Sequence, residues 1–152
     1  MPDENVAVIV ITLDRDRGDR TDIMDRRTLL VFDVWRIDPK WKFVAGHVEK
    51  GEIPVVAAQR ENSEEGGIFL PLCAYRHFHR EISPDHVVHY FVCESDLNHA
   101  PKYGDEDGRP LKIRTDVTLR QIWEGNIDFL PDQLESLRAI VGRKLLVEEY
   151  GV

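Results

Sequence analysis

GHVEKGEIPVVAAQRENSEEGGI, the stretch from Gly46 to Ile68, holds the strongest structural signal in this sequence. Pro54 suits the first turn of a helix and a glycine pair follows Glu65, so we predict a helix between these two residues. With about 3.6 residues per turn, the side chains of Glu61, Glu64 and Glu65 project from one helix face. Like charges at this spacing repel each other, so a bound cation would relieve the repulsion. The stretch therefore predicts an acidic pocket between the helix and the loop before it.

The spacing over the whole stretch is more specific than the helix alone, since a bare ExxEE pattern is typical of a solvated helix face. The stretch fits GX₅EX₇REUXEEXGU, where U is an apolar residue. The residues at the fixed positions are Gly46, Glu52, Arg60, Glu61, Glu64, Glu65 and Gly67, with Ile68 at the closing apolar position. It thus resembles the Nudix box, and the chain resembles the Nudix hydrolases. The resemblance implies the α/β class, with a Nudix-like α/β/α sandwich built on a mixed β-sheet. It also implies a pyrophosphohydrolase that cleaves the diphosphate linkage of a nucleoside diphosphate joined to another moiety.

The same resemblance implies a metal site on the helix. Glu61, Glu64 and Glu65 carry over as ligands of Mg²⁺, for which Mn²⁺ can substitute, and the backbone carbonyl of Ala45 is a further candidate ligand. Carboxylates are suitable ligands because Mg²⁺ is held by hard oxygen donors and by substrate phosphates. A metal-bound water then attacks the phosphate.

The catalytic candidates are Glu64, Glu61, Arg60 and Glu52. By resemblance, Glu52 secures the loop and Arg60 pairs with a neighbouring carboxylate and holds its orientation; an exposed surface ion pair is the alternative for Arg60. The general base stays open. A glutamate of the box can activate the water, or Glu106 can do so from a distant acidic loop, which is otherwise only solvated.

One box position departs from the family pattern. Asn62 occupies a position that is normally aliphatic, and on the helix it lies towards the predicted core. A buried amide without a partner costs about 1–3 kcal/mol by mutational measures. We therefore expect Asn62 to have a hydrogen-bond partner or a partly wet site.

Substrate contacts outside the box are expected from His77, His79, Tyr90 and Glu106. The alternatives are an ordinary strand surface for the histidines and a core position for Tyr90. HxH on a strand would put His77 and His79 on one face, as in many zinc sites. The predicted hairpin, however, directs His89 to the opposite face, which argues against zinc.

The flanking sequence supports one domain over residues 1–152, with strands before and after the box and a helix at the end. The stretches 14–27 and 96–109 are polar, and we predict an exposed connection and a long mobile loop for them. Apolar spacing predicts a C-terminal helix over about 130–147. The predicted strands are 6–13, 28–37, 41–44, 70–82 and 86–93.

Composition narrows the classes of partner. The net charge of −8 argues against a nucleic-acid polymer, because phosphate backbones are bound chiefly by clustered Lys and Arg. It suits a small nucleotide diphosphate bound through metal ions.

The longest apolar run, residues 6–11, is too short for a membrane span of about 20 residues. We expect a cytoplasmic protein, since no signal peptide opens the chain, with Cys73 and Cys93 reduced and buried. The sequence leaves monomer and homodimer open.

A rival function belongs to another class, since a fold does not fix an activity. A Nudix domain without catalysis would act as a nucleotide sensor or an interaction module. The complete set of box carboxylates favours the enzyme. The substrate stays open: Pro84 lies where ADP-ribose hydrolases of the family carry a proline, but an ordinary Ser-Pro-Asp turn explains it equally well.

Overall fold

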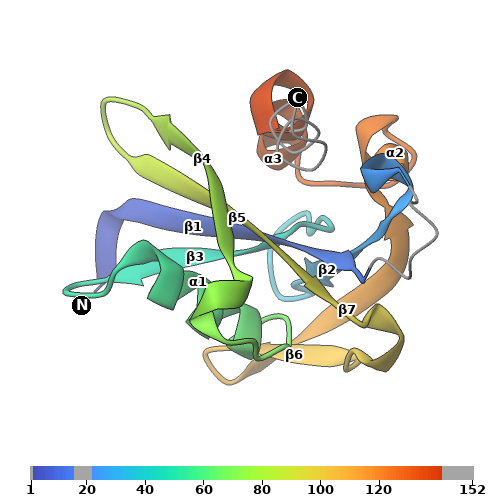
Figure 1. Cartoon of the computed structure of the whole chain (residues 1–152), viewed down its shortest axis with the longest axis horizontal. Coiled ribbons are helices and arrows are strands. Elements are labelled where there is room, and N and C mark those ends of the chain that lie inside the picture. The colour runs from blue at the N-terminus through green and yellow to red at the C-terminus, as the bar shows by residue number, and fades with distance from the viewer. Residues whose placement is uncertain (1, 16–21, 142–152) are drawn as a thin grey trace.

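A mixed, seven-stranded β-sheet forms the centre of the computed structural model, which describes residues 2–15 and 22–141 (Figure 1). The strands run in the order β4-β5-β1-β2-β7-β6, and β3 pairs with β1. β1 is parallel to β5 and antiparallel to β2 and β3. The strand bounds are β1 Pro2–Asp14, β2 Arg27–Phe32, β3 Val44–Glu49, β4 Arg76–Ile82, β5 Val87–Ser95, β6 Tyr103–Glu106 and β7 Arg109–Thr118. The predicted mixed sheet of the α/β class is confirmed.

Helices cover both faces of the sheet (Figure 1). They are α1 Pro54–Glu64, α2 Leu119–Trp123 and α3 Pro131–Ser136, which continues as a π-helical turn over Leu137–Val141 (η4). Short 3₁₀ turns are η1 Ile23–Asp25, η2 Leu72–Ala74 and η3 Leu97–His99. Within residues 2–15 and 22–141, no helix is long and apolar enough to cross a membrane.

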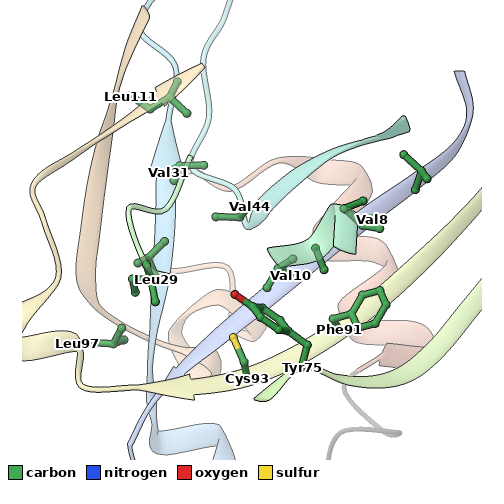
Figure 2. Packing of buried hydrophobic residues seen from close by; sticks show 14 residues of the cluster. Val8, Val10, Leu29, Val31, Val44, Tyr75, Phe91, Cys93, Leu97 and Leu111 are labelled. Atoms are coloured by element: carbon green, nitrogen blue, oxygen red, sulfur yellow. The ribbon is translucent and has the colours of Figure 1, made fainter. Parts of the chain in front are cut away.

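The two faces of the sheet bury separate apolar cores, because successive side chains of a strand alternate between faces. On one face, Val8 and Val10 of β1 pack with Ala57 and Ala58 of α1, and Figure 2 shows Tyr75 and Cys93 among the side chains of this core. On the other face, a core that includes Ile11, Leu13, Phe43 and Tyr90 packs with α2 and η4. This arrangement gives the predicted α/β/α layers, and α1 is fixed against the sheet through its small alanines.

The strand predicted over 28–37 is shorter than expected. β2 ends at Phe32, because Asp33 begins a turn in which its carboxylate accepts a hydrogen bond from the Trp35 amide at 2.9 Å. The strand predicted over 41–44 is also displaced. Trp41 and Lys42 make only isolated bridges, and β3 starts at Val44.

The prediction of a long mobile loop over 96–109 is wrong. After η3, residues 103–106 form β6, which pairs antiparallel with β7. The tight turn uses Asp107 and Gly108, both with positive φ, and the Asp105 carboxylate accepts a hydrogen bond from the Gly108 amide at 3.2 Å. β7 and α2 lie in a part of the chain to which the sequence pattern assigned no element.

A bulge in β4 changes the placement of the histidines. His77 pairs with Phe91, and His79 pairs with Tyr90, so Phe78 is the extra residue between them. His77 and His79 therefore lie on opposite faces. The prediction that His89 points away from His77 is wrong, since the two rings share a hydrogen bond of 3.0 Å between Nε2 of His77 and Nδ1 of His89.

Other predictions need smaller corrections. Cys93 is buried and reduced as predicted, but Cys73, also reduced, is exposed in η2. The strand predicted over 70–82 begins only at Arg76, after that turn. The stretch 14–27 is not wholly exposed, because Ile23 and Arg26 are buried; its residues 16–21 lie outside the described chain. Residues 142–147 of the predicted C-terminal helix also lie outside the described chain.

Candidate active site

An acidic cavity of about 420 Å³ lies between α1, β3, the turn after β2 and the tip of the β6–β7 hairpin. We call it the acidic pocket. The cations that line it are Arg36, Lys42 and Arg60. Its acidic lining residues are Glu49, Glu61, Glu64, Glu65, Asp105, Glu106 and Asp107. All three box carboxylates and Glu106 thus face one space, although they come from two distant parts of the sequence.

Helix α1 presents these carboxylates at different depths. As predicted, the helix starts at Pro54, and it ends at Glu64 with Glu65 as its C-cap. Glu61 and Glu65 are buried, with Glu65 only 4% exposed, whereas the Glu64 side chain is 56% exposed. Two buried carboxylates one helical turn apart are costly unless cations or donors compensate them.

Strand β3 leaves room for these carboxylates. A Cβ on Gly46 would overlap the carboxylate group of Glu61, so only glycine lets that side chain lie against the strand. The neighbouring Ala45 amide donates a hydrogen bond of 3.3 Å to Oε1 of Glu65. Ala45 and Gly46 both line the acidic pocket, which brings the backbone of β3 beside the helix carboxylates.

Arg60 links the loop before the helix to the carboxylates. Its Nε and Nη2 donate to the two carboxylate oxygens of Glu52 at 3.0 and 2.9 Å. Nη1 donates to Oε1 of Glu61 at 2.7 Å, and Nη2 also donates to the carbonyl oxygen of His47 at 3.0 Å. The hydrogen bonds from Arg60 lower the pKa of Glu52 despite its partial burial. This fork orients Glu61 and closes the loop between β3 and α1.

Burial dominates the electrostatics of the pocket. It raises the pKa of Glu61, and it raises the pKa of Glu65 to about 8 even though Lys42 opposes the shift. Nζ of Lys42 lies 3.9 Å from Oε1 of Glu65, and both side chains are largely buried. Sequence reasoning missed Lys42, and the signal for it was a charged residue between Trp41 and Phe43 just before the box.

Glu106 reaches the pocket because β6 lies directly against α1. A Cβ on Gly104 would overlap the carbonyl oxygen of Glu65, so the strand approaches the end of the helix backbone to backbone (Figure 1). Oε1 of Glu106 lies 3.3 Å from Nη2 of Arg36. Its Oε2 is buried without a hydrogen-bond partner among the residues that the structure describes.

Three predicted substrate-binding residues lie elsewhere. His79 and Tyr90 are buried on the sheet face opposite α1, with ring centroids 5.4 Å apart. His77 is exposed on the α1 side of β4, where it contacts His89 and Phe91. None of the three lines the acidic pocket, so of the predicted substrate contacts only Glu106 is brought to it.

The donor set suits a hard divalent cation. Among residues 2–15 and 22–141, no group of three His, Cys, Asp or Glu side chains is already arranged around a point that would hold a metal ion. The pocket nevertheless offers carboxylate oxygens at several depths and the partnerless buried Oε2 of Glu106. Oxygen donors that leave coordination positions to substrate are typical of Mg²⁺ sites.

Comparisons with known proteins agree with this architecture. The family model described as the NUDIX domain matches residues 3–132. A structure of MutT from a study of the Aliivibrio salmonicida and Vibrio cholerae proteins has 18% identity and a TM-score of 0.61, over 93% of this chain and 96% of that chain. The NUDIX domain of Shewanella oneidensis NrtR, complexed with ADP ribose, has 12% identity and a TM-score of 0.64, over 92% and 87%.

A third similar structure is a T. brucei MERS1-RNA complex, with 17% identity and a TM-score of 0.53 over 67% of this chain and 37% of that chain. The chain spans about two fifths of the length of the first structures it matches. No curated protein matches it. At these identities the structural likeness establishes the fold alone.

Proposed function

The chain belongs to the Nudix family, and from its acidic pocket we propose that it is a divalent-metal-dependent pyrophosphohydrolase. The substrate class is a nucleoside diphosphate linked to another moiety. The observation that carries the proposal is the burial of Glu61 and Glu65 on one helix face, with Glu64 beside them. Burial disfavours the ionised form of both groups, and a bound cation would compensate for their ionisation.

We assign the metal ligands to Glu61, Glu64 and Glu65, with the Ala45 carbonyl and Glu106 as further donors. A bound Mg²⁺ or Mn²⁺ would neutralise phosphate oxygens and acidify a water molecule. Glu64 is the most exposed of the three carboxylates, so a metal held by them would be accessible to substrate from the side of Glu64. The partnerless Oε2 of Glu106 supports its inclusion.

In the proposed reaction, water adds to one phosphorus and the anhydride P–O bond breaks, so that two phosphate-bearing products leave. One oxygen of Glu64 would bind the metal, and its other oxygen would accept the proton of the attacking water and release it to solvent, to which this side chain is exposed. Glu61 accepts a 2.7 Å hydrogen bond from Arg60, and Glu65 is deeply buried. Glu64 is more than half exposed, and its contact with Arg60 is longer, at 3.8 Å. Glu64 is therefore the box carboxylate with the best access to solvent. Glu52 and Arg60 act by holding Glu61 and the loop in place.

The rival proposal is a binding module without catalysis, either a nucleotide sensor or an RNA-binding domain. The similar structures include an ADP ribose complex and an RNA complex, which motivates both versions. The net charge of −8 and the acidic lining of the pocket disfavour RNA, because a polyanion needs clustered cations. They fit a small diphosphate that binds together with metal.

A substrate panel with matched variants tests the proposal. Nucleoside triphosphates, dinucleoside polyphosphates and nucleotide sugars including ADP-ribose are incubated with Mg²⁺, and monophosphate products are measured by chromatography. Glu64→Gln and Glu65→Gln should each lower turnover about 100-fold on the best substrate, the scale of losing one charged contributor to transition-state stabilisation. Glu124→Gln, at the end of α2 and outside the pocket, is the control and should keep full turnover. Activity that survives both pocket substitutions contradicts the metal mechanism, and binding of ADP-ribose without any product favours the sensor.

A further inference from the structure

Glu106 is held in the acidic pocket by a chain of charges that begins outside it. Nη2 of Arg36 lies 3.3 Å from Oε1 of Glu106, and Nε of the same arginine lies 3.3 Å from Oδ2 of Asp33. Arg36 belongs to the turn after β2, while Glu106 ends β6, so the guanidinium joins two segments 70 positions apart.

Asp33 anchors this connection. Its side chain is only 1% exposed, whereas the Arg36 side chain is 58% exposed. Oδ1 of Asp33 accepts the Trp35 amide at 2.9 Å, and Oδ2 lies 3.9 Å from Nη2 of Arg109 at the start of β7. Oδ1 is thus held by a hydrogen bond, whereas Oδ2 has none among the described residues and is paired only electrostatically, with Arg36 and Arg109. This buried negative charge attracts the exposed Arg36 guanidinium and so restricts its position.

We propose that Asp33 and Arg36 are positioning residues that fix the orientation of Glu106 in the acidic pocket. Arg36 pairs with Oε1 of Glu106 and leaves Oε2 available to a divalent cation. This inference rests on the proposed function, in which Glu106 contributes to the metal site.

The acidic surroundings of Glu106 give such a restraint a physical role. Glu65 and Glu106 line the same pocket, so their carboxylates repel each other whenever both are ionised. Without Arg36, this repulsion would favour rotation of the Glu106 side chain away from Glu65 and towards solvent. The backbone contact at Gly104 fixes the strand but not the side chain.

The sign of the change in metal affinity separates a positioning role of Arg36 from a simple charge effect. Arg36 is a cation beside a cation site, so loss of its charge alone should tighten metal binding. Loss of positioning should weaken it. The two effects act in opposite directions on one measurable quantity.

The experiment is a double-mutant cycle on Mn²⁺ affinity, measured by electron paramagnetic resonance on the protein without substrate. Arg36→Gln should weaken Mn²⁺ binding about tenfold when Glu106 is present and change it less than about twofold in the Glu106→Gln background, since residues of one network couple. Arg36→Lys should restore only part of the affinity, because an ammonium group cannot span both carboxylates as the guanidinium does. Asp33→Asn should act in the same direction as Arg36→Gln.

The matched control is Arg120→Gln, which removes a similarly exposed arginine whose partner is Asp25, away from the pocket. It should leave Mn²⁺ affinity unchanged. Tighter binding by Arg36→Gln, or the same change in both Glu106 backgrounds, overturns the inference while the proposed function stands. A wild-type protein that binds no Mn²⁺ and cleaves no substrate overturns the proposed function, and this inference with it.

Discussion

The Glu61 carboxylate occupies the space in which a side chain at Gly46 would stand. At the pocket, the Glu61 carboxylate of α1 therefore lies directly against the β3 backbone, with no side-chain carbon of residue 46 between them. The group that Gly46 accommodates also receives the 2.7 Å hydrogen bond from Arg60. One missing methyl group thus permits the arrangement of Glu61 and its arginine.

Gly46→Ala should separate activity from stability. The obstructing atoms belong to the end of a flexible side chain, so Glu61 can rotate away and the free energy of unfolding should change by less than about 1 kcal/mol. Turnover should fall about tenfold or more, because the carboxylate leaves its place. Urea unfolding and steady-state kinetics on one preparation measure both quantities. Unchanged turnover would show that the position of Glu61 is not needed.

Gly104→Ala, unlike Gly46→Ala, should lower the stability of the protein markedly. Its Cβ would meet the main-chain carbonyl of Glu65, which cannot rotate away, so strand and helix must separate. We expect a loss of about 2 kcal/mol or more in the free energy of unfolding, as for overpacked sites. Gly46→Ala is the matched control in the same urea titrations. Equal stability of the two variants would contradict the close docking of β6 on α1.

The metal-free protein should lose stability as the pH rises from about 4.5 to about 8. Glu65 has a pKa of about 8 in the folded protein against an ordinary value of 4.5, chiefly because it is buried. Between these values the folded chain holds a proton that the unfolded chain has released, so rising pH favours unfolding. Below the lower value, both states are protonated and the stability is fully present.

Urea unfolding in the presence of a chelator, at several pH values in this window, measures the effect. Glu65→Gln carries no ionisable group at this position and should show a flatter dependence; part of the slope remains, because burial also raises the pKa of Glu61. A wild-type slope of the opposite sign, or an identical slope in the variant, would show that Glu65 is ionised as easily in the fold as in water.

Asn62→Leu should destabilise the protein by about 1–3 kcal/mol. Asn62 is fully buried, accepts a hydrogen bond from the Thr12 hydroxyl at 3.2 Å and donates one to the Tyr75 hydroxyl at 3.3 Å. An apolar side chain would leave both hydroxyls without this partner. Tyr75→Phe, which removes only one of the two bonds, is the control with the smaller expected cost. A neutral or stabilised Asn62→Leu variant would show that these bonds contribute little.

The box helix and its carboxylates could be predicted because their signal is local. Pro54, the helical spacing of Glu61 and Glu65 and the following glycines all act within a few turns of chain. The predicted partner for Asn62 is also confirmed, although only the fold identifies it as Thr12 and Tyr75. Burial of an amide on a helix demands a partner but does not say which one.

The second wall of the pocket could not be predicted, because it depends on contacts between distant segments. Residues 103–106 look like a polar loop, yet they pair with β7 as a strand, and Gly104 lets this strand lie against the end of α1. The position of Arg36 in the pocket could not be predicted from its neighbours in sequence, because it depends on ion pairs with both Asp33 and the distant Glu106. The bulge at Phe78 is a single inserted residue, but it moves His79 to the other face and invalidates any argument from simple alternation.

The position of β1 in the middle of the sheet also has a consequence for how the chain acquires its structure. Its hydrogen-bonded neighbour β5 is far away in sequence: Thr12 and Cys93, which touch in the folded protein, are separated by 81 positions. Long-range parallel pairing is slow because a large loop must close before any contact compensates for the lost entropy. During synthesis, β1 can pair with the nearer β2 and β3, but its other edge stays unpaired until β5 has been made. Refolding should accordingly be slower than for a helical protein of this size, and the nascent chain should be prone to aggregation until β5 emerges.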